Sequence, residues 1–252
     1  MNMAGHSQFK NIMHRKGAQD AKRAKLFAKL AREITVAAKS GLDDPKQNPR
    51  LRNAILNARS ENMPNDKIKK AILKASSNDA SNNYNEIRYE GFGNSGISII
   101  IEALTDNKNR TASEVRSILT KNGGNLGETG SVAFNFKQVG EITFDTSISN
   151  KDEIIMYSIE NEATDIIEED SIFRIICAPN YLGVLRNSLE QKFSEPKTSK
   201  LIWSAINLIE INKDEAKKIF YIIDALEEND DIQNVYTNIN ISENILKEIS
   251  YD

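Results

Sequence analysis

The sequence has few of the residues that build metal, redox and disulfide sites. Its 252 residues include one cysteine, Cys177, and two histidines. A lone cysteine excludes an intramolecular disulfide framework, and one cysteine with two histidines is too small a set for a standard structural zinc site. Cys177 lies in the apolar run 172–178, which predicts a buried strand residue rather than a nucleophile. We therefore expect no metal site and no cofactor.

Long hydrophobic runs are also missing. No apolar stretch approaches the ~20 residues that a helix needs to cross a bilayer. The N-terminus lacks the hydrophobic segment of a secretory signal, and it is not serine-rich like a transit peptide. With 39% hydrophobic and 27% charged residues, the composition is that of an ordinary soluble protein. We expect a cytoplasmic protein without a membrane partner.

The usual motifs of catalysis are absent as well, with no Walker motif, nucleophile elbow or Cys/His pair. Residues 91–96 match G-x-G-x-x-G, but a dinucleotide site needs a helix after this loop. The next residues, 97–104, have a strand pattern instead, which favours a glycine-rich hairpin. The acidic groups at 168–170 and 227–231 have no histidine nearby in sequence and are typical of solvated turns and helix ends. We expect no enzymatic activity.

Charge is distributed unevenly along the chain. Residues 1–75 hold 17 Lys and Arg against 6 Asp and Glu, whereas residues 76–252 hold 16 against 30. This asymmetry is typical of a nucleic-acid-binding module attached to acidic domains. It would also let the basic and acidic parts attract each other.

The stretch 3–38 combines an arm without hydrophobic periodicity and a helix with separated faces. One face of that helix carries the apolar residues Phe27, Leu30, Ala31, Ile34, Ala37 and Ala38. Nearly opposite lie Lys22, Lys25, Lys29 and Arg32. Such a ladder of cations is suited to phosphates, although an isolated lysine stripe is also typical of a solvated helix face.

The arm adds further cations and hydrogen-bonding side chains to this stripe. Lys10, Arg15, Lys16 and Arg23 precede or flank it, and both histidines lie in the arm, where they supply hydrogen bonds. The predicted nucleic-acid contacts are His6, Lys10, His14, Arg15, Lys16, Lys22, Arg23, Lys25, Lys29 and Arg32.

The remaining pattern predicts an α+β protein with several cores. Two more short helices complete an N-terminal bundle, the first capped by Asn48 and the second at 65–75, and a polar linker follows at 76–85. We expect later helices at 111–122, 150–162, 179–193 and after Asn212. We expect strands at 86–91, 97–104, 132–136, 141–144, 164–167, 172–178, 206–211 and 232–241. A turn near 138–140 should join the third and fourth strands, and residues 194–200 should form a polar connection. In the helix at 150–162, we expect Ile154, Ile155 and Ile159 to face inward.

Several short motifs in the sequence have the form of a family signature. They include AGHSQF at 4–9, HRKGAQDAKR at 14–23, YEGFG at 89–93, TDNKNRT at 105–111 and GGNLG at 123–127. Together they resemble the signature of the YebC/PmpR family, which also includes the mitochondrial translational activator of cytochrome oxidase. The matches are dense in the first half of the chain and loose in the second. Members usually carry tryptophan where this chain has Phe9.

The resemblance also implies a domain layout. Family members have a helical N-terminal domain followed by two α/β domains, the third inserted into the second. For this chain we expect a basic helical domain at 1–80, an α/β domain at 81–133 plus 206–252, and an inserted α/β domain at 134–205.

Three functions fit these observations. The basic N-terminal part and the resemblance favour a DNA-binding transcriptional regulator. The mitochondrial relative suggests a ribosome-associated translation factor that binds ribosomal RNA, and electrostatics does not separate the two because both ligands present phosphates. The third alternative is a protein-interaction module whose basic arm docks on the acidic domains. No compelling recognition helix is evident, and only Phe9 and Phe27 supply aromatic rings to the arm and the first helix.

Overall fold

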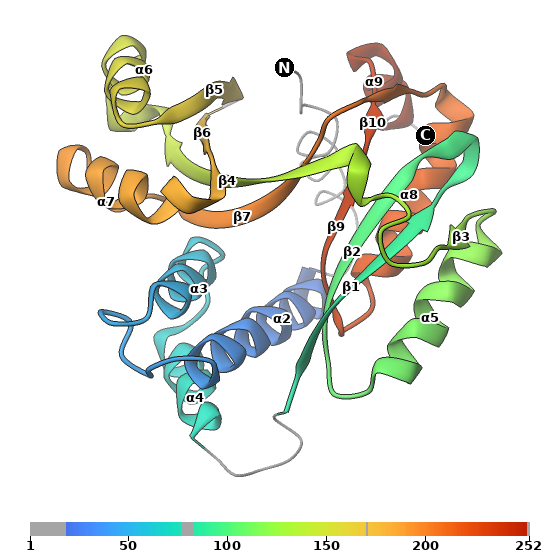
Figure 1. Cartoon of the computed structure of the whole chain (residues 1–252), viewed down its shortest axis with the longest axis horizontal. Coiled ribbons are helices and arrows are strands. Elements are labelled where there is room, and N and C mark those ends of the chain that lie inside the picture. Colours follow the sequence, from blue (N-terminus) through green and yellow to red (C-terminus); the bar gives the residue numbers. More distant parts are fainter. Residues whose placement is uncertain (1–18, 77–82, 170, 251–252) are drawn as a thin grey trace. The chain divides into compact units, whose positions relative to one another are not determined.

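The computed structural model describes residues 19–76, 83–169 and 171–250 (Figure 1). Contacts between Cα atoms divide the chain into two compact units. The described residues of the first unit fall within Met1–Lys29, Asp79–Lys137 and Trp203–Asp252, and those of the second within Leu30–Asn78 and Gln138–Ile202. Both units contain helices and strands, so the α+β class expected from the sequence is confirmed. The finer division into three domains stays a prediction.

The first unit is built on an antiparallel sheet. Its elements are β1 (Asn85–Phe92), β2 (Ser98–Thr105), α5 (Lys108–Lys121), β3 (Asn125–Leu126), β8 (Ile209–Glu210), α8 (Lys213–Glu227), β9 (Ile232–Thr237), β10 (Ile239–Asn240) and α9 (Glu243–Ser250). Four of the strands form the sheet in the order β3-β1-β2-β9, with every neighbouring pair antiparallel. Strands β8 and β10 form a separate short parallel pair.

Strands β1 and β2 form the glycine-rich hairpin that the sequence predicts. Their register runs from Asn85 opposite Thr105 to Phe92 opposite Ser98, and a short 3-10 turn joins them. Gly96 ends this turn with a φ of +77°, a conformation that side chains with a Cβ rarely adopt. The glycines at 91–96 therefore belong to a hairpin and not to a strand–loop–helix nucleotide site.

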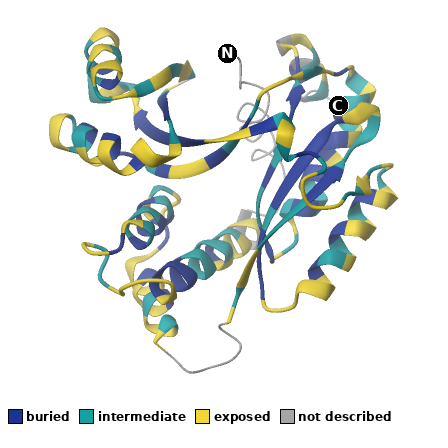
Figure 2. Cartoon of the chain, viewed as in Figure 1, coloured by how far each residue is buried: buried dark blue, intermediate teal, exposed yellow. Residues whose placement is uncertain are grey.

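Strand β2 is buried on both faces, as its run of isoleucines predicts. Ile99 and Ile101 pack with α5 and α8 in the main core of this unit, and Ile100 packs on the other face against Val132 and Phe136. Figure 2 shows β2 buried along nearly its whole length. Helices α5 and α8 cover one face of the sheet because their apolar stripes both contribute to that core.

The second unit contains the end of one helix, four more helices and the other four-stranded sheet. Helix α2 (Gln19–Lys39) continues into it from the first unit, and its further elements are α3 (Pro49–Ser60), α4 (Asn65–Ala75), β4 (Phe136–Asp145), α6 (Lys151–Glu160), β5 (Ala163–Glu169), β6 (Ile172–Cys177), α7 (Leu182–Lys192) and β7 (Thr198–Ala205). The first two residues of β4 and the last three of β7 belong to the first unit. The sheet has the order β5-β6-β4-β7. The three N-terminal helices expected from the sequence are therefore confirmed.

Specific caps and ties join these three helices. The Asn48 side chain accepts a hydrogen bond from the Leu51 N–H at 3.1 Å, which caps α3, and its amide group donates to the Ala37 carbonyl at 2.8 Å. The Thr35 hydroxyl donates to the Ala71 carbonyl at 2.9 Å and so links α2 to α4. The predicted N-cap thus also holds the end of the preceding helix.

Helices α6 and α7 form a second core with this unit's sheet. The core includes Ile142, Phe144, Phe173 and Ile175 from β4 and β6. Cys177 is fully buried among these residues, and burial raises the pKa of its thiol to about 11. The prediction that Cys177 is a buried strand residue is confirmed.

The expected strands at 132–136 and 141–144, joined by a turn, are wrong. A 3-10 turn at Ala133–Asn135 leads directly into the continuous strand β4. Gly140, which suggested a turn, lies inside β4, where a Cβ would come within 2.7 Å of the Cys177 Sγ and 3.0 Å of the Leu182 Cβ. This glycine serves close packing of the strand against its neighbours.

Three further expectations differ from the structure. Residues 194–200 were expected to form a connection, but β7 begins at Thr198, and only Ile209 and Glu210 of the expected strand 206–211 are extended in β8. Ile159 was expected inside the core, yet it is 61% exposed. Helix α9 was not expected at all. Periodicity discriminates poorly in segments as short as these.

Glu90 on β1 is a buried acid that anchors the loop after β3. Its carboxylate accepts hydrogen bonds from the N–H groups of Gly130, Val132 and Ala133 at 2.8–2.9 Å. Burial opposes ionisation of this carboxyl, but the three N–H donors and Arg88 lower its pKa overall. The ionised side chain therefore stabilises the loop.

We expect Glu90→Ala to lower the free energy of unfolding by about 2–4 kcal/mol at pH 7, because three N–H donors, one of them buried, lose their charged acceptor. The contribution of the ionised Glu90 carboxylate to stability is fully present above the ordinary pKa of 4.5. It is lost as pH falls through the lower pKa that this group has in the folded chain. Urea unfolding at pH 7 and pH 3 measures both effects. Glu128→Ala, an exposed change in the same loop, is the control and should cost less than about 0.5 kcal/mol. Equal losses in the two variants would contradict this role of Glu90.

Candidate nucleic-acid interface

The predicted contact residues divide into an arm and a helix. Those in the arm lie outside the described residues, namely His6, Lys10, His14, Arg15 and Lys16. The others lie on α2, namely Lys22, Arg23, Lys25, Lys29 and Arg32. The geometry of the site can therefore be built from α2.

Helix α2 separates apolar and charged side chains as the sequence predicts. Phe27, Ile34 and Ala37 on the apolar face are buried. Lys22, Arg23 and Lys25 are exposed, and Lys29 and Arg32 are partly buried. The guanidinium of Arg23 lies over the Phe27 ring, 5.3 Å from its centroid, which holds the cation at the surface.

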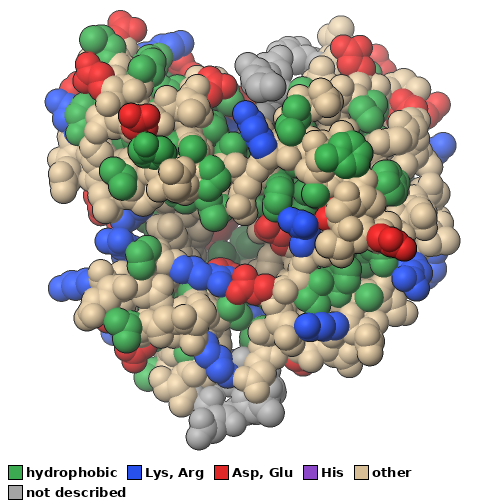
Figure 3. All heavy atoms as spheres, in the orientation of Figure 1, with side chains coloured by type: hydrophobic (Ala, Val, Ile, Leu, Met, Phe, Trp, Pro, Cys, Tyr) green, Lys and Arg blue, Asp and Glu red, His purple; other side chains and the backbone are tan. Residues whose placement is uncertain are grey.

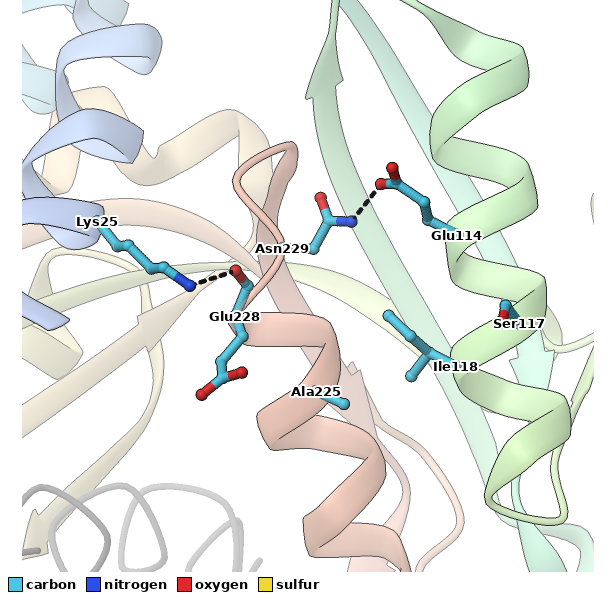
Figure 4. Close-up of a pocket in the computed structure, with 7 residues that line it drawn as sticks. All are labelled: Lys25, Glu114, Ser117, Ile118, Ala225, Glu228 and Asn229. Atoms are coloured by element: carbon cyan, nitrogen blue, oxygen red, sulfur yellow. Dashed lines mark hydrogen bonds between the residues drawn. The ribbon is translucent and has the colours of Figure 1, made fainter. Parts of the chain in front are cut away.

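Two lysines of the stripe bind the C-terminal end of α8. The Lys25 Nζ donates to the Glu228 carbonyl at 3.1 Å, and the Lys29 Nζ donates to the Glu227 carbonyl at 2.5 Å. Figure 4 shows the Lys25 amino group aimed at this backbone oxygen. The last carbonyls of a helix lack partners within the helix and carry its negative dipole end, so lysines near them are stabilising.

Acidic side chains surround the same helix end. Asp224, Glu227 and Glu228 lie within about one turn of α8 and its C-cap. Burial raises the pKa of Asp224 to about 6, and Glu227 and Glu228 add to this shift, whereas the Lys22 charge opposes it. The positive stripe of α2 thus meets a negative region of the same unit.

A hollow of about 320 Å³ lies beside the Lys25 contact. Its lining residues come from α2, α5 and the end of α8, and they are Lys25, Glu114, Ser117, Ile118, Ala225, Glu228 and Asn229 (Figure 4). The Asn229 side chain donates to the Glu114 carboxylate at 2.6 Å across this hollow. Its mixed lining and open form do not resemble the enclosed apolar pocket of a small-molecule site.

Cations are not gathered into one patch on the face of the molecule drawn in Figure 3. Lysine and arginine side chains there are interspersed with acidic and apolar ones.

Two family models match the chain. The model described as the TACO1/YebC protein N-terminal domain matches residues 7–78, and the model described as the TACO1/YebC second and third domain matches residues 84–239. The chain belongs to the TACO1/YebC family. The resemblance to YebC/PmpR proteins that the motifs indicate is thereby confirmed.

A solved member of similar structure is the conserved hypothetical protein Aq1575 from Aquifex aeolicus. Its crystal structure superposes with a TM-score of 0.82 at 37% sequence identity, over 92% of this chain and 96% of that chain. The family fold therefore extends over nearly the whole chain. This relative's description assigns it no activity.

One family motif, at 105–111, forms the end of β2 and the start of α5. The Asn107 side chain accepts from the Arg110 N–H at 3.1 Å and caps α5. The Arg110 guanidinium contacts Asp231 at 2.7 Å and Asp106 at 2.8 Å, and hydrogen bonds to these two carboxylates raise its pKa. The charge of Arg110 is therefore balanced by two acids.

Sequence reasoning identified the cations of α2 but missed the partners of Lys25 and Lys29. Those partners are backbone carbonyls about 200 positions away, which no local pattern reveals. The one available signal was the opposite charge of the two parts of the chain, which left internal attraction open. Within the described ranges, no three His, Cys, Asp or Glu side chains lie where they could hold a metal ion, and no helix is long and apolar enough to cross a membrane.

The raised pKa of Asp224 predicts a pH-dependent effect of Asp224→Asn. An acid with a raised pKa costs stability once ionised, and this cost develops as pH rises from the ordinary value of 3.8 through about 6. At pH 7.5 we expect the variant to melt about 1–3 °C higher than the parent, a modest gain because the side chain is half-buried. At pH 4 the two melting temperatures should be nearly equal. Thermal melts at both pH values measure this difference. The control Asp214→Asn, an exposed change in the first turn of α8, should not raise the melting temperature. A melting temperature of Asp224→Asn below that of the parent at pH 7.5 would contradict the assigned pKa shift.

Proposed function

We propose that this member of the TACO1/YebC family is a DNA-binding transcriptional regulator that binds nucleic-acid phosphates through its N-terminal arm and the first turns of α2. The observation that carries the proposal is the exposure of Lys22, Arg23 and Lys25 on the helix that directly follows the basic arm. Residues 1–18 contain Lys10, Arg15 and Lys16 and no acidic residue. Uninterrupted positive charge attracts polyanions through release of their counterions.

The chemistry of this site favours contacts to the backbone of the nucleic acid over contacts to bases. Lysine is a flexible point charge, which suits phosphate oxygens but does not fix an orientation on a base edge. Phe27 is buried and so is not available for stacking on a base. Sequence preference would then arise from the shape of the nucleic acid or from further contacts made by the arm.

A second candidate is a ribosome-associated translation factor that binds ribosomal RNA. It is favoured by the same phosphate-directed contacts, because folded RNA presents closely spaced phosphates and is often recognised by its shape. The translational role of the mitochondrial family member points in the same direction. Both candidates use the same residues, so the bound nucleic acid must be identified directly.

We expect replacement of Lys10, Arg15, Lys16, Lys22 and Arg23 by Ala to abolish binding to DNA and RNA at physiological salt. Each lost phosphate contact should reduce the slope of log K against log salt by about 0.7–0.9. The melting temperature should stay close to that of the parent, because neither Lys22 nor Arg23 lies on the apolar face of α2. Fluorescence anisotropy with labelled duplex DNA and structured RNA measures the binding.

A matched control removes the same charge from exposed positions elsewhere, namely Lys46, Lys69, Lys70, Lys121 and Lys137. This control should retain most of the affinity, and equal losses in the two variants would contradict a localised site. Gradient sedimentation of lysates, with and without RNase, then separates the two functions. Comigration with ribosomes that is lost in the arm variant would favour the translation factor, and crosslinks to promoter DNA from light fractions would favour the transcriptional regulator.

A further inference from the structure

We propose that the C-terminal end of α8 is an internal competitor of polyanions, which holds Lys25 and Lys29 until a phosphate backbone displaces it. We call Asp224, Glu227 and Glu228, together with the carbonyls of the last two, the α8 acidic end. The inference rests on the proposed function, since it concerns how the same lysines are made available to nucleic acid.

The contacts of the two lysines occupy the atoms that a phosphate would bind. Lys25 and Lys29 each direct a charged amino group at a carbonyl oxygen of the α8 acidic end, at 3.1 and 2.5 Å. An ammonium group has three donors and forms short, charge-assisted hydrogen bonds with anionic oxygens. While a lysine is engaged in this way, its charge is partly neutralised by the helix end.

The α8 acidic end resembles a short run of phosphates in its charge. Carboxylates at positions i, i+3 and i+4 lie on one side of a helix, and the carbonyls between them add the negative end of the helix dipole. Lys22 also interacts with Asp224, so the influence of the α8 acidic end extends along the stripe from Lys22 to Lys29. Acidic surfaces of this kind compete with nucleic acid for cationic side chains.

Displacement of the α8 acidic end does not require the fold to change. Lysine has a long and flexible stem, so an exposed amino group reaches a neighbouring anion by rotation about its own bonds. Lys25 is exposed, and an exposed lysine pair is weak enough for a more highly charged ligand to replace it. Arg23, held at the surface over Phe27, would make the first contact, and the two lysines would follow.

The test removes the three carboxylate charges of the α8 acidic end, and leaves its carbonyls in place, with the triple change Asp224→Asn, Glu227→Gln and Glu228→Gln. The control is Glu128→Gln, Glu160→Gln and Glu210→Gln, which changes the net charge equally at exposed positions outside α2 and α8. We expect the first variant to bind a labelled DNA duplex about fivefold more tightly than the control at the same salt, in the range of typical coupling between sites. Equal affinities of the two variants would overturn the proposal.

A second pair of variants separates release of the lysines from simple loss of repulsion. In a background carrying Lys22→Ala, Lys25→Ala and Lys29→Ala, the triple change has no engaged lysines to release. The gain in affinity should then fall to that of the control, because the two sets of substitutions act on one interaction. A gain that persists in this background would mean that the acids merely repel the ligand, and the proposal would be overturned.

Heparin provides a polyanion that is not a nucleic acid, so the proposal can fail separately from the proposed function. Stronger retention of the triple variant than of the control on a heparin column, without binding of DNA or RNA by either, would support competition by the α8 acidic end and refute the nucleic-acid role. Equal retention would overturn the inference even if both proteins bind nucleic acid.

Discussion

Burial of strand β2 on both faces is the constraint on which the first unit depends. This strand is hydrogen-bonded to β1 and β9, and its alternate side chains enter two different cores. The centre of a strand buried in this way must be apolar, as Ile99, Ile100 and Ile101 are, and the two helices that cover one face pack against it. The end of α8, which binds Lys25 and Lys29, is therefore presented by a rigid framework.

This arrangement changes how the positive stripe of α2 is interpreted. In the sequence it is a ladder of cations available for phosphates, but in the folded unit two of its lysines already donate to carbonyl oxygens at the negative end of a helix. The same chemistry that attracts a nucleic acid also attracts a helix end, since both offer oxygen atoms with negative charge. A polyanion that binds these lysines must consequently replace the end of α8 as their partner. Its affinity depends on how much more strongly the lysines bind the polyanion than the helix end.

Local signals in the sequence predicted much of the fold. Asn48, Asn150 and Asn212 each cap a helix, and the side chain of each accepts a hydrogen bond from an N–H three residues later. These features are readable because they involve neighbours in the chain. The prediction of a turn at Gly140 failed because a glycine is needed there for another reason. Cys177 and Leu182 lie too close to leave room for a Cβ, and this proximity exists only in the folded protein. The partners of Lys25 and Lys29 were not predictable for the same reason.

The burial of Cys177 has a practical consequence for future work on this chain. Its thiol is enclosed by the core of the second unit and remains protonated at neutral pH, so it is a poor target for maleimides and oxidants. A cysteine introduced at an exposed position would then be the principal reactive thiol of the folded protein. Fluorophores or spin labels can therefore be attached at chosen sites without first removing the natural cysteine.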